Sequence, residues 1–134
     1  MLTQPPLPKG TIGVLVVEDD AILLMDTASA FTAAGMVVFE ALDADEAMAI
    51  LAQRNDISVV ITDLDMPTGR MSGRQLVDTI TDRWPDVGVV ILSGAGEARP
   101  RVLPDGVRFL HKPSPPGDLV SAAFAIVSWL TGSL

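Results

Sequence analysis

The sequence predicts an α/β fold in which helices cover both faces of a doubly wound, five-stranded parallel sheet. Two observations carry this prediction. Five short apolar runs alternate along the chain with segments of helical pattern, which is typical of βαβ units. The apolar runs also lack polar–apolar alternation, so they fit strands that are buried on both faces. Right-handed crossovers then place helices on both sides of the sheet.

The five predicted strands are short and rich in β-branched residues, which favour extended backbone. In chain order, these strands span residues 11–17, 36–41, 58–62, 87–92 and 107–110.

The predicted helices begin or end at residues that are common at helix boundaries. Gly35 ends the first helix, Asp43 starts the second as its N-cap, and Pro85 stops the third. The resulting helices span residues 21–34, 44–54, 73–84 and 117–130. The segment 95–106 lies where a further helix is expected, but it contains two prolines and two glycines. We therefore expect that helix four of the fold is short or broken.

Composition and charge exclude several classes of protein. A chain of 134 residues fits one domain, and the lack of cysteine excludes disulfides and thiolate chemistry. Seventeen acidic residues against nine basic ones give a net charge of −8, which argues against nucleic-acid binding. The longest uncharged stretch, 119–134, is shorter than the roughly 20 apolar residues of a membrane span. We expect a cytoplasmic protein with neither nucleic acid nor membrane as partner.

The expected domain organisation is simple. Residues 1–10 contain three prolines and lack a secretory signal, so we expect a flexible N-terminal tail there. One folded domain should span residues 11–131. Residues 132–134 form the C-terminal end, and no output domain follows in this sequence.

Polar side chains follow four of the predicted strands. In α/β sheets, functional residues gather at the carboxyl ends of the strands, so these side chains should lie near one edge. They are Glu18, Asp19 and Asp20 after the first strand, Asp63 and Asp65 after the third, Ser93 after the fourth, and His111 and Lys112 after the fifth.

These groups suit phosphoryl chemistry. Crowded carboxylates require a cation, and oxygen ligands suit Mg²⁺. A carboxylate such as Asp63 can form an acyl-phosphate, while the metal and Lys112 balance the charge of the phosphoryl group. Ser93 can donate one hydrogen bond to a phosphoryl oxygen. Each residue alone also fits a cap, a turn or a solvated side chain, and only their conjunction at the strand ends indicates phosphoryl chemistry.

Four segments of the chain resemble the receiver domains of bacterial two-component response regulators, the CheY-like family. These segments are VLVVEDD at 14–20, VVITDLDMP at 59–67, VILSG at 90–94 and FLHKP at 109–113. The resemblance extends over residues 12–130 and implies the flavodoxin-like strand order 2-1-3-4-5.

The resemblance also implies a role for each matched residue. Asp63 matches the phosphoacceptor. The implied Mg²⁺ ligands are Glu18, Asp19, Asp63 and the backbone carbonyl of Asp65. The implied phosphoryl-binding and switch residues are Ser93, Lys112 and Phe109. For Phe109, a role in the hydrophobic core fits the sequence equally well.

By this resemblance, Asp63 accepts a phosphoryl group from a sensor histidine kinase or a histidine phosphotransfer protein, with Mg²⁺ as cofactor. Phosphorylation then switches a surface that binds a downstream protein target. Such a domain is a signalling module and not an enzyme, beyond its own phosphotransfer and slow autodephosphorylation. The chain is either a single-domain regulator or a receiver excised from a larger protein, and a homodimer stays open.

The sequence departs from the family pattern in two regions. The loop after Asp63 reads MPTGRMSG, which is longer than the common form, and Ser72 stands where aspartate is usual. The segment 93–112 is shorter than usual and places the family's usual dimer face in doubt. In the last helix, Val120, Phe124 and Trp129 are expected to be partly exposed. Such a patch would suit a partner surface, and a helix covered by the tail 1–10 fits the sequence equally well.

Three other hypotheses account for part of the pattern. A degenerate receiver would bind proteins without being phosphorylated, although the full set of site residues argues against it. Asp63-Leu-Asp65 resembles the Asp-x-Asp motif of haloacid-dehalogenase-like phosphatases, but those enzymes carry it near the chain start. Glu18 with Asp63 and Asp65 resembles a Toprim arrangement, against which the net charge of −8 argues.

Overall fold

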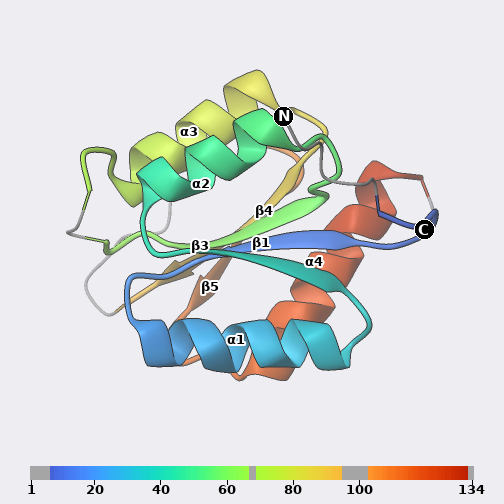
Figure 1. Cartoon of the computed structure of the whole chain (residues 1–134), viewed down its shortest axis with the longest axis horizontal. Helices are drawn as coiled ribbons and strands as arrows, with labels where there is room; N and C mark the ends of the chain where they lie inside the picture. Colours follow the sequence, from blue (N-terminus) through green and yellow to red (C-terminus); the bar gives the residue numbers. More distant parts are fainter. Residues whose placement is uncertain (1–6, 67–68, 95–102, 133–134) are drawn as a thin grey trace.

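A computed structural model of the chain describes residues 7–66, 69–94 and 103–132. Within these residues, five strands form one sheet that lies between two layers of helices (Figure 1). The elements are β1 (Gly13–Val17), α1 (Ala21–Ala33), β2 (Val37–Ala41), α2 (Ala44–Gln53), β3 (Val59–Asp63), α3 (Gly73–Arg83), β4 (Gly88–Ser93), β5 (Val107–His111) and α4 (Pro116–Leu130).

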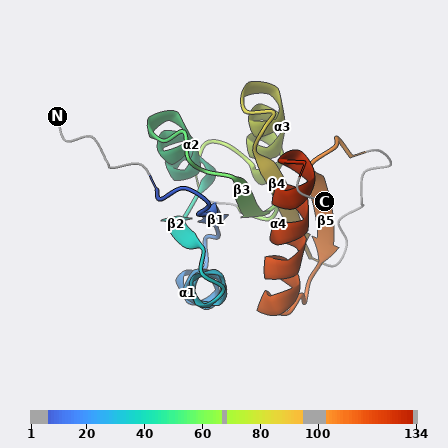
Figure 2. The same cartoon turned by 90° about the vertical axis from the view of Figure 1, so that its right-hand side faces the viewer.

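The strand order β2-β1-β3-β4-β5, with every neighbouring pair parallel, confirms the predicted doubly wound sheet. Helices α2 and α3 cover one face, and α1 and α4 cover the other (Figures 1 and 2). In this arrangement β1 and β3 lie inside the sheet, and their polar ends therefore meet at its centre.

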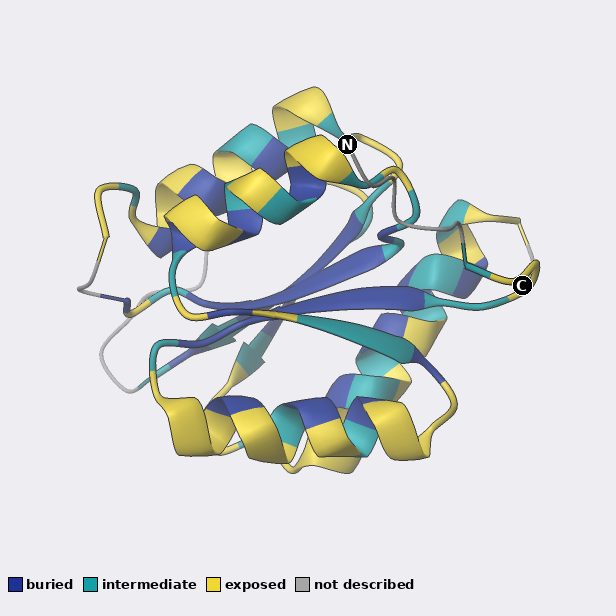
Figure 3. Cartoon of the chain, viewed as in Figure 1, coloured by how far each residue is buried: buried dark blue, intermediate teal, exposed yellow. Residues whose placement is uncertain are grey.

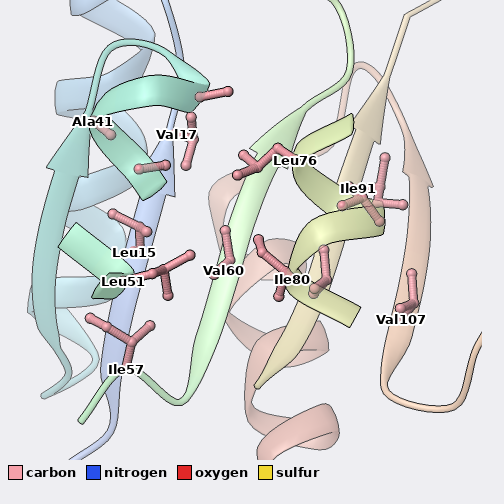
Figure 4. Packing of buried hydrophobic residues seen from close by; sticks show 14 of the residues in the cluster. Leu15, Val17, Ala41, Leu51, Ile57, Val60, Leu76, Ile80, Ile91 and Val107 are labelled. Carbon is pink, nitrogen blue, oxygen red and sulfur yellow. The ribbon is translucent and has the colours of Figure 1, made fainter. Parts of the chain in front are cut away.

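The core consists of two clusters, one on each face of the sheet. Successive residues of β1 alternate between them, because Leu15 belongs to the α2–α3 side and Val16 to the α1–α4 side. This explains why β1 is an unbroken apolar run whose residues are all buried (Figure 3). Figure 4 shows Leu76 and Ile80 of α3 directed into the first cluster beside Val60 of β3.

The strands end slightly later than predicted, and the difference concerns the polar residues. Asp63 and Ser93 are the last residues of β3 and β4, instead of the first residues beyond them. The reason is that the ladder continues past both: the Leu64 N–H donates to the Leu92 carbonyl (3.1 Å), and the Lys112 N–H donates to the Ser93 carbonyl (2.7 Å). These side chains are therefore placed by the sheet itself.

Helix boundaries follow the predicted signals closely. The Asp43 carboxylate accepts a hydrogen bond from the Glu46 N–H (2.8 Å) at the start of α2, as its N-cap role requires. Ser72 and Gln75 form a reciprocal capping box at the start of α3. Helix α4 begins at Pro116, one residue earlier than predicted, since proline suits the first helical position.

Several expectations concern residues outside the described part of the chain. The short or broken helix predicted within 95–106 falls mostly on residues 95–102, which are not described. Of the predicted tail, residues 7–10 are described, and the Thr11 N–H donates to the Pro8 carbonyl (3.1 Å). In the described residues, no helix is both long and apolar enough to cross a membrane.

The outer surface of α4 carries the exposed apolar side chains that the sequence predicted. Phe124 is 55 % exposed and Trp129 is 53 % exposed, whereas Val120 is only half-buried. The opposite side of α4 packs on β4, where Gly88 allows a very close approach. A Cβ atom at position 88 would lie 2.1 Å from Cγ2 of Ile126. The helix therefore sits closer to the sheet than any larger residue at this position would permit.

This close approach predicts a specific coupling between two positions. We expect Gly88→Ala to lower the free energy of unfolding by about 1–3 kcal/mol, because the added methyl group overpacks the contact with Ile126. In the background of Ile126→Ala, which removes Cγ2 and costs about 2–5 kcal/mol alone, the same substitution should cost almost nothing. Urea unfolding of the four proteins measures the coupling, and strictly additive losses would contradict it.

Candidate functional site

The carboxyl ends of the strands lie at the left of Figure 1, and four polar side chains belong to this edge of the sheet. Glu18 follows β1, Asp63 ends β3, Ser93 ends β4 and Lys112 follows β5. Three of them are almost fully buried: Glu18, Asp63 and Ser93 are 6 %, 2 % and 0 % exposed. Burial of carboxylates is costly unless charges and hydrogen bonds compensate it, so each contact here matters energetically.

Both carboxylate oxygens of Asp63 are engaged. The Lys112 ammonium donates to Oδ2 and forms an ion pair with it, and the Asp65 backbone N–H donates to Oδ1 (2.9 Å). The Lys112 side chain is 35 % exposed, so it reaches the buried carboxylate from the solvent side. The result is a carboxylate of fixed orientation at the opening of the edge.

Among these four residues, Glu18 is a carboxyl group whose ionised form is disfavoured by its surroundings. Burial raises the pKa of Glu18 to about 7, and the negative charge of Asp63 adds to the shift. A hydrogen bond from the Asp20 backbone N–H (3.1 Å) and the positive charge of Lys112 act in the opposite direction, but they do not cancel it. The folded protein therefore disfavours the ionised form of Glu18.

The neighbouring carboxylates raise the pKa of Lys112. Partial burial alone would lower the pKa of Lys112, but the hydrogen bond and charge of Asp63 outweigh it. The charges of Glu18 and Asp65 add to the effect, and together they hold the pKa above its usual value. The ammonium is thus stabilised by an excess of surrounding carboxylates.

The acidic residues of this edge offer the donor set that Mg²⁺ prefers. Glu18 and Asp63 are buried, Asp19 is half-buried and Asp65 is exposed, against the single ammonium of Lys112. Across the described residues, no group of three or more His, Cys, Asp or Glu side chains forms a ready-made metal cage. Mg²⁺ usually takes only one or two carboxylates and keeps several waters, so the residues present fit a hydrated ion.

The acidic triplet after β1 divides between two tasks. Whereas Glu18 is buried beside Asp63, the exposed Asp20 caps α1 by accepting hydrogen bonds from the N–H groups of Ile22 (2.9 Å) and Leu23 (3.2 Å). The Asp20 carboxylate is thus engaged at the start of α1.

Ser93 and Phe109 are close to the site but do not touch Asp63 through a described hydrogen bond. The Ser93 hydroxyl donates to the Gly94 carbonyl (3.3 Å), and its strand position is level with His111 of β5. Phe109 is 7 % exposed and belongs to the core cluster on the α2–α3 side. Its ring lies edge-on to His111, with centroids 5.2 Å apart. The core role considered for Phe109 is therefore present in this structure.

Gly73 is a site residue that the sequence identified only as a helix start. A Cβ atom at position 73 would lie 2.6 Å from the Asp63 carbonyl oxygen and 2.8 Å from Cα of Leu64. The first turn of α3 therefore packs directly on the peptide that follows Asp63. Only the predicted helix boundary could have indicated this contact, since nothing in the local sequence shows how close the two backbones lie.

Comparisons with known proteins agree with this architecture. The response regulator receiver domain matches residues 14–124. The sensor kinase CckA of Brucella abortus (strain 2308) is 32 % identical over 109 residues, which cover 80 % of this chain and 11 % of that protein. The chain thus spans about a tenth of the length of this relative.

Solved structures share the fold over nearly the whole chain. A receiver domain from Clostridium thermocellum has a TM-score of 0.78 at 26 % identity, covering 92 % of this chain and 99 % of that one. A receiver protein from Sinorhizobium medicae WSM419 has a TM-score of 0.75 at 24 % identity, covering 90 % and 98 %. The latter likeness concerns the fold alone. With the sequence match over residues 14–124, these findings show that the chain belongs to the response regulator receiver family.

Proposed function

We propose that Asp63 accepts a phosphoryl group from a phosphohistidine on a sensor histidine kinase or a histidine phosphotransfer protein. One observation carries this proposal: the Asp63 carboxylate is buried at the carboxyl edge of the sheet and is held there by Lys112 and the Asp65 N–H. A nucleophile must be oriented before it reacts, and these two contacts orient the Asp63 carboxylate beside a Lys112 side chain that is partly exposed. Membership in the receiver family supports the same assignment.

In the proposed reaction, one carboxylate oxygen of Asp63 attacks phosphorus, and the bond between phosphorus and the imidazole nitrogen breaks. The imidazole keeps the electron pair of that bond and takes up a proton from solvent. Both Asp63 oxygens have partners in the unphosphorylated protein, so one contact must give way. The Lys112 side chain is long and partly exposed, so its ammonium can move from the Asp63 carboxylate to the phosphoryl oxygens.

Glu18, Asp19, Asp63 and the backbone carbonyl of Asp65 are the groups that would hold Mg²⁺. A bound Mg²⁺ supplies positive charge that stabilises the transferring phosphoryl group. The raised pKa of Glu18 supports this proposal, because a cation beside Glu18 would offset the burial and the charge of Asp63 that disfavour its ionised form.

Phosphorylation would then act as a switch through the neighbouring strands. An acyl-phosphate adds roughly the charge of other phosphorylated side chains, about −1.5 to −2. Lys112 and Ser93 are joined through the Lys112 N–H and the Ser93 carbonyl, so movement of either reaches both β4 and β5. Phe109 packs in the core below them and would report the change. The output is the altered affinity of a surface for a downstream protein target.

Chemical phosphorylation tests the role of Asp63 as the phosphoacceptor. After incubation with acetyl phosphate and Mg²⁺, the wild-type protein should gain the mass of one phosphoryl group in intact mass spectrometry. Asp63→Asn should gain none, because the amide is not a nucleophile of comparable strength. Omission of Mg²⁺ with chelation should also abolish the gain.

The controls separate this function from its competitors. Asp78→Asn is a suitable matched variant, because Asp78 lies on α3 away from the sheet edge, and it should be phosphorylated like wild type. Equal labelling of wild type and Asp63→Asn would remove Asp63 from the mechanism. Complete absence of labelling in the folded wild type, together with no Mg²⁺ binding, would favour the unphosphorylated binding module instead.

The buried Glu18 should make the free energy of unfolding depend on pH. In the metal-free protein, the folded state raises the pKa of Glu18 from 4.5 to about 7, so it binds this proton more tightly than the unfolded state does. Ionisation of Glu18 therefore lowers the free energy of unfolding as pH rises through this window. Relative to wild type, Glu18→Gln should gain about 1–3 kcal/mol of stability between pH 4.5 and 7.5.

Urea unfolding at pH 4.5, 6 and 7.5 in the presence of a chelator tests this dependence on Glu18. The exposed Glu46→Gln serves as the control for the loss of one carboxylate away from this edge of the sheet. A stability difference between wild type and Glu18→Gln that does not change over this range would contradict the prediction.

A further inference from the structure

The loop that follows Asp63 makes a long-range contact with the start of α2. The Arg70 backbone N–H donates to Oδ2 of Asp45 at 2.8 Å, across 25 residues of sequence. A hydrogen bond from a backbone N–H to a carboxylate is charge-assisted and therefore stronger than a neutral one. This contact ties the loop that carries Asp65 to a different helix of the same layer.

Gly69 brings the loop backbone close to the same carboxylate. Its φ of +89° is in the region that favours glycine. A Cβ atom here would lie 3.0 Å from Oδ2 of Asp45 and 3.3 Å from Cβ of Asp43. The packing of Gly69 and the hydrogen bond of Arg70 thus place two successive residues against the first turn of α2.

The platform under this contact is well anchored. Asp43 caps α2 by accepting a hydrogen bond from the Glu46 N–H. Ala44 and Ala47, which belong to the buried side of α2, are fully buried. The loop leaves the site where the Asp65 N–H donates to Oδ1 of Asp63, and it ends at the Ser72 capping box. The Asp45 contact lies between these two ends.

We propose that Asp45 is a positioning residue for the phosphoacceptor site: it holds Gly69 and Arg70 on α2 and thereby fixes the segment that presents the Asp65 N–H to Asp63. This inference rests on the proposed function for its effect on phosphorylation. The physical reason is that ordering an irregular connection between a strand and a helix costs conformational entropy, and a tether within that connection restricts its conformations in advance.

Four variants separate the tether from other effects of the same substitution. Asp45→Ala removes the acceptor, whereas Asp45→Asn removes the charge and keeps an acceptor oxygen. Glu46→Ala removes an acidic side chain from the same first turn and so controls for the helix dipole. Gly69→Ala attacks the contact from the loop side, because its Cβ atom would collide with Asp45.

The functional measurement is the rate of Asp63 phosphorylation by acetyl phosphate at saturating Mg²⁺. We expect Asp45→Ala and Gly69→Ala to slow it about threefold to tenfold, and their combination to be no slower than either alone. Asp45→Asn should restore the rate to within about twofold of wild type, and Glu46→Ala should stay in that range. Equal rates for Asp45→Ala and Glu46→Ala, or an Asp45→Asn as slow as Asp45→Ala, would overturn the proposal.

A second measurement does not depend on phosphorylation. Hydrogen exchange of the Asp65 and Arg70 amides, followed by NMR, should be several-fold faster in Asp45→Ala than in wild type and near wild type in Asp45→Asn. If the wild type were not phosphorylated, the proposed function would fail while this exchange result still decided the role of Asp45. Unchanged exchange at the Asp65 amide in Asp45→Ala would overturn the positioning role by itself.

Discussion

The structure around the sheet edge depends on one constraint, which is the burial of the Asp63 carboxylate where β3 ends. A carboxylate that is 2 % exposed requires compensation, and it obtains this from one ammonium and one backbone N–H. Both donors come from chain segments that the sheet places: Lys112 follows β5 directly, and Asp65 follows β3 by two residues. The parallel arrangement of the strands is therefore the condition for a stable charge at this position.

The compensation is incomplete, and this makes the edge responsive. Burial raises the pKa of Glu18 to about 7, and the charge of Asp63 adds to this shift, so the folded protein disfavours the ionised form of Glu18. The two apolar core clusters supply the stability that tolerates this repulsion. A site of this kind gains stability when positive charge arrives, and the proposed Mg²⁺ would supply such a charge.

The sequence was informative where signals are local and uninformative where contacts are distant. The apolar run of β1, the cap at Asp43 and the polar end of β3 each follow from a few adjacent residues, and each was predicted. The contact between Asp45 and Arg70 spans 25 residues and depends on the path of a loop, which no local pattern encodes. The position of Phe109 in the core likewise depends on packing between layers, and the sequence left it undecided.

Different kinds of contact hold the two sides of the Asp63 edge, and this gives the proposed switch a direction. On the α2–α3 side, Gly73 brings the backbone of α3 against the peptide after Asp63, and Asp45 holds the loop. On the β4–β5 side, Lys112 meets Asp63 through a flexible, partly exposed side chain. New charge on Asp63 would lie against closely packed backbone on the α2–α3 side and against the long Lys112 side chain on the β4–β5 side. We therefore expect the response to travel through Lys112 and the backbone bond that joins it to β4.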